Sequence, residues 1–394
     1  MFNRHNNLVF TLLAFAGFLS LASTRLCDAM LPALAQTFET SPSAAAAAIS
    51  SYAVAYSVMQ IVYGPLGDRF GKLHVIALAS AYCALSTALA AMAPSLSALV
   101  LARAAMGAGA AAIIPLGLAW IGDTVPLAQR QQALARYSGV TVVGHMAGPL
   151  LGGVFTQMLN WRAAFLVIAP MFACMALLLW LRMKAEPVPS DSVQPAGRCA
   201  PYFDQARALL ADPWARWVLT VGCLEGALGI GCMAFVPTVL HTDFGLTLME
   251  GGSLVALFGL GGFLFSQSAA ALLRRVPAAT LPGIAGVLLA LGFGLLAVMP
   301  HWGWAIPACL LAGFGFFMLH NTLQVQATQL SATASGLVFS LFTCAIFMGQ
   351  SVGVALGAVS FTRFAPAWSF GGAGLALMLT GLALMRLLRA RANA

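Results

Sequence analysis

The chain has 394 residues, of which 61% are hydrophobic and 8% charged, whereas about a quarter of the residues in an ordinary soluble domain are charged. Its 19 Lys and Arg and 11 Asp and Glu are too few to coat a protein of this size in water, so most of the surface must face lipid. This composition excludes a water-soluble globular enzyme. The formal charge of +8 does not indicate nucleic-acid binding, because the basic residues lie scattered in short gaps between apolar runs.

Apolar runs of about 20 residues, the length that crosses a bilayer core about 30 Å thick, occur twelve times along the chain. The predicted spans are 8–35, 43–66, 72–93, 96–121, 132–158, 162–183, 214–240, 248–272, 277–299, 303–325, 333–360 and 366–388. The first span ends in an Ala-Leu-Ala that imitates a signal-peptide cleavage site. Arg25 and Asp28 interrupt its approach and more membrane follows, so we expect this span to be retained.

One long polar interval, residues 184–213, divides the spans into six and six. We therefore predict an N-terminal six-helix bundle at 1–183, a cytoplasmic linker at 184–213 and a C-terminal six-helix bundle at 214–394. If both termini are cytoplasmic, only Arg162 and Arg363 among the basic loop residues lie outside, as the positive-inside rule favours. The fold class expected is an all-α membrane protein with two pseudo-symmetric bundles.

The two halves also show a weak repeat. Residues 28–32, Asp-Ala-Met-Leu-Pro, align with residues 233–237, Met-Ala-Phe-Val-Pro, and a short acidic outer loop follows each. Repeated halves of this kind build many secondary transporters, whose substrate site lies near the midplane between the repeats. The architecture therefore predicts a carrier.

The gap between the second and third spans is a tight glycine-rich turn with an adjacent acid and base. The residues that define this turn are Gly64, Asp68, Arg69, Gly71 and Lys72. Asp68 is placed to cap a neighbouring helix or pair with a base from another helix, while Arg69 and Lys72 hold the headgroup side, so the turn is interpreted as a conformational latch. The alternative is that these bases serve only topology.

The turn resembles the G-x-L-x-D-R-x-G-R-K signature of the major facilitator superfamily. This sequence departs from the signature at Lys72, which replaces Arg, and at Leu73, which replaces the second base. The resemblance extends over the chain through the six-plus-six layout and implies the major facilitator fold. The matching place in the second half, Arg274-Arg275, has lost the acid, so a second latch is not expected.

The fourth span carries Arg103 one turn before Gly107 and Gly109. A charged group at membrane depth costs roughly 2.5–3.5 kcal/mol on insertion scales, so Arg103 is expected to face a partner or a wet cavity. The alternative is that it snorkels to the outer interface. The run resembles the R-x-x-Q-G-x-G motif of proton-coupled drug antiporters, with Met106 in place of Gln. That resemblance implies a role for the arginine in proton transfer.

Small residues recur along one face of the fifth span. They are Gly144, Gly148, Pro149, Gly152 and Gly153. Glycines every four residues make a groove that lets another helix pack closely, and the proline bends the helix. The run resembles the G-x-x-x-G-P-x-x-G-G motif of antiporters in the superfamily, which implies export in place of uptake.

Two acids lie well inside spans, away from the span ends: Asp28 in the first and Glu225 in the seventh. Burial in hydrocarbon disfavours a charged carboxylate, so each is a candidate proton carrier, and the resemblance places both helices at the central cavity. Arg25 lies three residues before Asp28, on the same helical face, so Asp28 has the alternative role of a structural salt bridge. Glu225 has no basic residue nearby in its span.

Other side chains at cavity depth are candidates to line a substrate pocket, with simple interhelical packing as the alternative for each. The candidates are Arg25, Gln60, His145, Gln267, His320, Asn321, Gln350, Tyr52, Tyr56, Phe235, Phe258 and Phe314. The eight cysteines include no C-x-x-C pair, so no metal site or disulfide framework is expected.

The function predicted is a proton-coupled antiporter that exports a small amphipathic, drug-like compound by alternating access. A dedicated exporter of a metabolite such as a sugar, amino acid or siderophore is the alternative, and proton symport for uptake is a further one. A membrane enzyme or sensor is not favoured, since no catalytic cluster or nucleotide-binding signature occurs. We expect a monomer in a bacterial inner membrane, with lipid, substrate and protons as partners and neither cofactor nor nucleic acid.

Overall fold

A computed structural model describes residues 4–185, 199–330 and 335–392 of the chain. Every regular element in these ranges is helical, and twelve helical runs in them are long and apolar enough to cross a membrane. Their limits lie within a few residues of the predicted spans; the first, for example, runs Asn7–Thr37. The prediction of a twelve-helix, all-α membrane protein is confirmed.

The first six spans are built from nine α-helices and one short 3-10 turn. They are α1 (Arg4–Arg25), η1 (Asp28–Met30), α2 (Leu31–Thr37), α3 (Pro42–Ala45), α4 (Ala47–Phe70), α5 (Lys72–Ala91), α6 (Leu96–Ala110), α7 (Ile113–Thr124), α8 (Leu127–Met158) and α9 (Trp161–Ala185).

The second six spans follow the polar interval, which itself holds a helix, α10 (Cys199–Ala211); its residues 186–198 lie outside the described ranges. The remaining elements are α11 (Pro213–Glu225), the π-helical segment η3 (Gly226–Gly231), α12 (Val236–Phe244), α13 (Leu248–Arg275), η4 (Ala278–Thr280), α14 (Leu281–Val298), η5 (Trp302–Trp304), α15 (Ala305–Thr328), α16 (Ser335–Arg363) and α17 (Pro366–Ala392).

Spans 1 and 7 are both broken, at corresponding places in the two halves. In span 1 the break falls between α1 and α2, and Pro32 stands at the start of α2. In span 7 the helix widens into η3 and resumes as α12, where Pro237 stands at the same position. A proline has no amide hydrogen to give to the carbonyl four residues earlier, so the Pro32 and Pro237 of the weak sequence repeat account for both breaks. Discontinuous helices of this kind mark substrate and ion sites in transporters.

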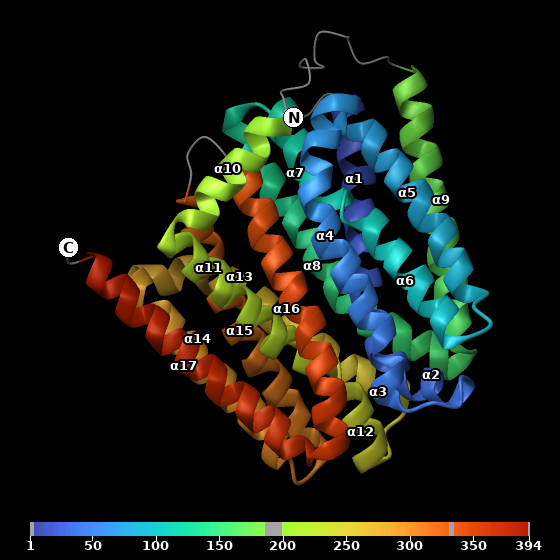
Figure 1. Ribbon diagram of the computed structural model, residues 1–394, viewed down its shortest axis with the longest axis vertical. Helices are drawn as coiled ribbons and strands as arrows, with labels where there is room; N and C mark the ends of the chain where they lie inside the picture. The colour runs from blue at the N-terminus through green and yellow to red at the C-terminus, as the bar shows by residue number, and fades with distance from the viewer. Residues whose placement is uncertain (1–3, 186–198, 331–334, 393–394) are drawn as a thin grey trace.

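The two bundles lie side by side, with the blue-to-green helices of the first half at the right of Figure 1 and the yellow-to-red helices of the second half at the left. The helices α2, α3 and α12 lie together at the lower end, and α10 lies at the upper end. Two helix pairs make the most extensive contacts between the halves, α4 with α16 and α8 with α13. These pairs, spans 2 and 11 and spans 8 and 5, are related by the internal repeat.

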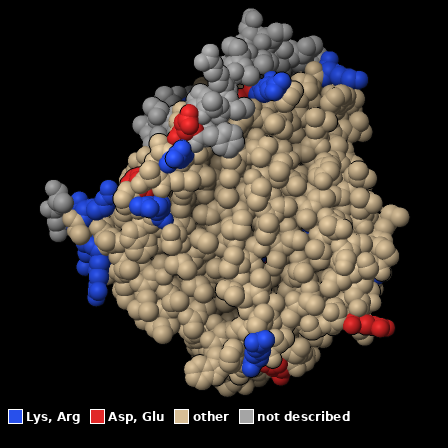
Figure 2. All heavy atoms as spheres, viewed as in Figure 1, with Lys and Arg blue, Asp and Glu red and all other residues tan. Residues whose placement is uncertain are grey.

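Charged side chains at the surface gather toward two sides of the molecule. Figure 2 shows them along the upper-left margin and at the lower margin of one face, with a broad uncharged band between. Many large apolar side chains in the spans are exposed, including Leu85, Leu101 and Leu356 at 60%, 71% and 64%. This band has the character of a surface that faces hydrocarbon.

Candidate functional site

Span 1 buries an ion pair at its break. Arg25 is the last residue of α1 and Asp28 opens η1, and Arg25 Nε donates to Asp28 Oδ2 at 2.7 Å with both side chains at most 2% exposed. Arg25 Nη2 and Asp28 Oδ1 are buried and have no hydrogen-bond partner among the described residues. The pair is therefore neutral as a unit but leaves one donor and one acceptor unused.

The side chain of Arg103 reaches the same break in span 1 and donates hydrogen bonds to backbone carbonyls there. Its Nη1 donates to Ser23 O at 2.8 Å and its Nη2 to Thr24 O at 3.4 Å, and these carbonyls belong to the last turn of α1, where helical partners are missing. Its Nε donates to Ala48 O of α4 at 3.1 Å, and the guanidinium lies 4.3 Å from the centre of the Tyr52 ring. Arg103 thus ties α6 to the broken end of α1 and to α4.

The alternative that Arg103 snorkels to the outer interface is wrong. The residue is 0% exposed, and its charge is met by carbonyl oxygens and an aromatic face within the bundle. Those contacts hold the segment that carries Asp28.

Span 7 buries its own acid just before its break. Glu225 closes α11 and is followed at once by the π-helical η3, a type of irregularity common at functional sites. Glu225 Oε2 lies 3.2 Å from His320 Nδ1 of α15. The carboxylate is fully buried, whereas the His320 side chain is 26% exposed. Glu225 Oε1 is buried and has no partner in the described chain.

Two phenyl rings connect the ion pair of span 1 to the acid of span 7. The Arg25 guanidinium lies 5.8 Å from the ring centre of Phe258 on α13, so it reaches from the first bundle to the second. The Phe258 ring lies 5.3 Å from Phe316, which stacks on His320 at 5.9 Å with an angle of 11° between the planes. The two buried acids therefore share one continuous cluster between the bundles.

The motif glycines of span 5 place this cluster. A side chain at Gly144, Gly148 or Gly152 would collide with the backbone of span 1, at Phe18 and Ala22 of α1 and at Leu26 just after it respectively. At Gly148 it would also meet the Cβ of Arg25 at 3.2 Å. Close approach of α8 to α1, which only glycine permits here, thus positions the Arg25 side chain.

The end of the same motif contacts the other bundle. A side chain at Gly153 would collide with Leu248 O at the start of α13. One at Gly252 of α13 would collide with Pro149 O, and one at Gly259 would collide with the side chain of Met146. The motif therefore has two faces, one against α1 and one against the second half.

The remaining cavity candidates divide between the cluster and its surroundings. His145 precedes Gly148 by one turn of α8, is 9% exposed, and has a buried Nδ1 without a partner among the described residues. Tyr56 packs on Phe347 of α16 at 4.2 Å and joins the bundles. Gln60 Nε2 donates to Ala111 O at 3.3 Å, at the break between α6 and α7.

Phe235 and Asn321 do not join the cluster. Phe235 stacks on Phe361 at 4.8 Å, beside α12 at the lower end of the molecule in Figure 1. Asn321 is exposed and, as the residue after His320, points about 100° away from it around α15. These two candidates are therefore not brought to the buried acids.

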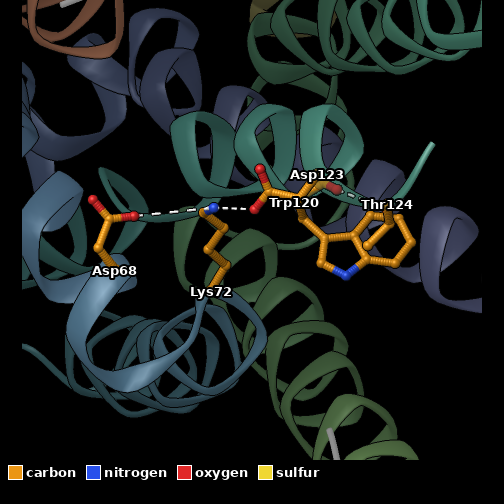
Figure 3. Close-up of polar contacts among 5 residues, drawn as sticks. All are labelled: Asp68, Lys72, Trp120, Asp123 and Thr124. Carbon is orange, nitrogen blue, oxygen red and sulfur yellow. Dashed lines mark hydrogen bonds and ion pairs between the residues drawn. The ribbon is translucent and has the colours of Figure 1, made fainter. Parts of the chain in front are cut away.

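The predicted latch lies at the end of α4 and the start of α5 (Figure 3). Gly71 separates the helices with φ of 85°, a left-handed conformation that glycine tolerates. Lys72 Nζ lies 4.0 Å from Asp68 Oδ1 and pairs more closely with Asp123 of α7. Lys72 thus turns toward α7 instead of the headgroups, and Gly67 packs against Leu116 of the same helix. Gly64 lies within α4, and Arg69 is exposed.

Asp123 is the residue of this network that sequence reasoning missed. It ends span 4, one residue before the close of α7, so it did not count among the acids within spans. Its position 51 residues from Lys72 gave no local signal of pairing. The charged turn therefore connects three helices of the first bundle.

Comparison with known proteins agrees with this architecture. Residues 13–347 match the family model described as Major Facilitator Superfamily. The chain belongs to this superfamily. Among relatives, it is 27% identical to "Uncharacterized MFS-type transporter YceJ" of Bacillus subtilis, over 84% of each chain. It is 23% identical to "Putative multidrug resistance protein MdtD" of Salmonella newport, covering 90% of this chain and 86% of that protein.

A solved structure shares the fold. The crystal structure of a bacterial homolog to the human lysosomal transporter Spinster, inward-facing and unoccupied, superposes with a TM-score of 0.75 and 18% identity, over 99% of this chain and 96% of that one. At this identity the likeness concerns the fold alone. This superfamily member therefore has the fold of a membrane transporter.

Proposed function

We propose that this superfamily member is a proton-coupled antiporter that exports a small amphipathic organic compound by alternating access. The observation that carries the proposal is the buried Glu225–His320 pair at the break in span 7, joined through Phe316 and Phe258 to Arg25 and Asp28. The relatives named for multidrug resistance support the export of a drug-like compound.

Glu225 is the proposed proton carrier. Its carboxylate is fully buried, and its one partner among the described residues is the partly exposed imidazole of His320. A proton arriving at His320 can be passed over 3.2 Å to Glu225. For an uncharged substrate, moving the charge of one proton through ~150 mV supplies roughly 3.5 kcal/mol, enough to drive a concentration gradient of a few hundredfold. Exchange of one proton for a monovalent cation moves no net charge and is driven by the pH gradient alone.

Asp28 and Arg103 are proposed to support this step from the first bundle. Asp28 is held by a permanently charged arginine, which suits the alternative role of a structural salt bridge. Arg103 holds the break that carries it. We assign Arg103 to positioning, with any part in proton transfer acting through Asp28.

The glycine motif of span 5 is the proposed pivot about which the two halves rock during alternating access. Its glycines fix α8 to α1, and its Pro149–Gly153 end touches α13 of the other bundle, so α1 and α8 move as one unit against α13. The network of Asp68, Lys72 and Asp123 is the proposed latch at the opposite end. Asp68 remains largely exposed there and is free to pair elsewhere in another conformation.

The location proposed is a bacterial inner membrane, with both termini and the linker in the cytoplasm and a monomer as the working unit. Bundle boundaries at 1–183 and 214–394 are part of this proposal. The basic residues at the ends of α9, α13 and α17 support the orientation through the positive-inside rule.

The test is uptake of ethidium, an amphipathic cation, into inverted membrane vesicles energised by respiration. Parent vesicles are expected to accumulate the dye, and a protonophore that collapses the pH gradient should abolish accumulation. Glu225→Gln should bind the dye but lose the proton-driven component. The folded fraction of Asp28→Asn should still accumulate the dye in a proton-dependent way.

Three outcomes decide the proposal. Accumulation in Glu225→Gln at the parental rate contradicts the assignment of the proton carrier. Dye that leaves inverted vesicles together with protons contradicts export. No energised transport by the parent contradicts the amphipathic substrate class.

A further inference from the structure

A recess lies on the outer surface of the first bundle, away from the buried acids. It has a volume of about 510 Å³ and opens between α4, α5 and α9. Its wall is apolar and aromatic, formed by Leu66 and Phe70 of α4, Leu78 and Tyr82 of α5, and Trp180 of α9. None of the described residues of the second bundle lines it, so it is separate from the site between the halves.

The recess faces the membrane and spans one leaflet. Phe70, Leu78 and Trp180 are 56%, 61% and 42% exposed. From the start of α5 at Lys72 to Tyr82, the helix rises about 15 Å, which is half of a bilayer core about 30 Å thick. The recess therefore runs from the charged end of α4 to about the middle of the bilayer, the length of one acyl chain.

Positive charge surrounds the mouth of this recess. The Arg69 guanidinium lies 5.1 Å from the ring centre of Phe70, and Lys184 follows Trp180 by one turn of α9. Lys72 is paired with Asp68 and Asp123. Arg69, Lys184 and Lys72 together with these two acids carry a net charge of +1.

Aromatic groups lie at the same level. His74 lines the recess near its mouth, and its ring meets Trp180 edge-on at 6.4 Å. Rings with one polar edge are favoured at the membrane interface, where headgroups begin. In membrane proteins generally, basic pockets between spans on the cytoplasmic side bind acidic lipid headgroups.

We propose that this recess binds one anionic phospholipid of the cytoplasmic leaflet. One acyl chain lies along the wall from Phe70 to Tyr82, and the phosphate lies between Arg69 and Lys184. The net positive mouth favours a headgroup with a net negative charge, such as phosphatidylglycerol, over a zwitterionic one. This inference depends on the membrane location and orientation of the chain and not on the identity of its transported substrate.

The test measures contact between lipid and Trp180 in the full-length protein. The protein is reconstituted in phosphatidylcholine vesicles that contain an equal fraction of phosphatidylglycerol, phosphatidylethanolamine or phosphatidylcholine with brominated acyl chains, which quench tryptophan fluorescence on contact. The Trp180 signal is the difference between the parent and Trp180→Phe. We expect several-fold stronger quenching by the phosphatidylglycerol probe than by the other two.

Two controls make the result specific. Trp304 is exposed to a similar degree, 47%, but lies at the far end of another span in η5, so its difference signal should not depend on the headgroup. The double variant Arg69→Gln, Lys184→Gln should lower phosphatidylglycerol quenching of Trp180 to the phosphatidylcholine level, with phosphatidylcholine quenching unchanged.

The proposal has clear contrary results. Equal quenching of Trp180 by all three probes would mean ordinary annular lipid. Strongest quenching by phosphatidylethanolamine would mean that the exposed Asp68 selects an amine. A preference for phosphatidylglycerol that survives in the double variant would remove Arg69 and Lys184 from the site.

Discussion

Spans 1 and 7 occupy matching places in the two halves, and the difference between their buried acids is instructive. Both spans break near a proline and both bury a carboxylate at the break. Asp28 is paired with Arg25, three residues away in its own span, and both are sealed from solvent. Glu225 is paired with His320 from a different span, and that histidine is partly exposed.

The chemistry of the partner separates the two sites. A guanidinium stays charged under all physiological conditions, so the span 1 pair is neutral and fixed. An imidazole can exist with or without its second ring proton, so the span 7 pair can hold one proton more or one fewer. The same scaffold therefore provides a rigid ion pair in one half and a site suited to proton exchange in the other.

The largest effect is expected from breaking the rigid pair. Asp28→Asn leaves the Arg25 charge buried without its partner, at a cost of about 3–5 kcal/mol in the free energy of unfolding. The double variant Arg25→Gln, Asp28→Asn should recover much of that loss, because no isolated charge remains. Denaturant unfolding in mixed micelles measures both values. A double variant as unstable as Asp28→Asn would contradict the account of a neutral pair.

A smaller loss of stability is expected when the backbone carbonyls at the break in span 1 lose the Arg103 guanidinium that binds them. Arg103→Lys keeps the charge but cannot reach Ser23 O, Thr24 O and Ala48 O together with one ammonium group. The expected loss is about 1.5–3 kcal/mol, the value of a hydrogen bond to a charged group. The same unfolding assay checks it, and unchanged stability would mean that the α1 terminus does not need this ligand.

The packing of α8 on α1 predicts a further, smaller loss. Gly148→Ala places a methyl group against Ala22 O and Arg25, and overpacking of this kind typically costs 1–3 kcal/mol. Gly139→Ala on the same helix is the matched control, since no described atom outside its own stretch of helix lies within 4 Å of the added methyl group. The melting temperature should fall in the first variant and hold in the second. Equal melting temperatures would remove the motif from the positioning of Arg25.

The smallest change in stability is expected in the second half. Glu225→Gln keeps a neutral group of similar size beside His320, so the free energy of unfolding should change by less than about 1 kcal/mol. A loss as large as that of Asp28→Asn would show that Glu225 is also a fixed ion-pair member, and the contrast between the halves would disappear.

Much of the fold follows from sequence, because an α-helix that crosses lipid needs a long apolar run, which can be recognised in the sequence. The Arg25–Asp28 pair also followed, since residues three apart share a helical face. The Glu225–His320 contact joins residues 95 positions apart, and Lys72 pairs with Asp123 across 51. Neither has a local pattern, because each depends on how the spans pack.

The ligands of Arg103 were also beyond sequence reasoning. They are backbone carbonyls, which every residue has, and they become available only because span 1 breaks at Asp28. Pro32 marked that break in the sequence, but only the packing of α6 against α1 and α4 brings the guanidinium to it.

Infrared titration of the buried carboxyl groups tests the central contrast most directly and needs no substrate. The protein is reconstituted in lipid, and the carbonyl stretch of protonated carboxyl groups is followed as pH is varied. We predict a titrating band that persists in Asp28→Asn and is lost in Glu225→Gln. A band lost in Asp28→Asn and retained in Glu225→Gln would contradict the account and assign proton exchange to the first half.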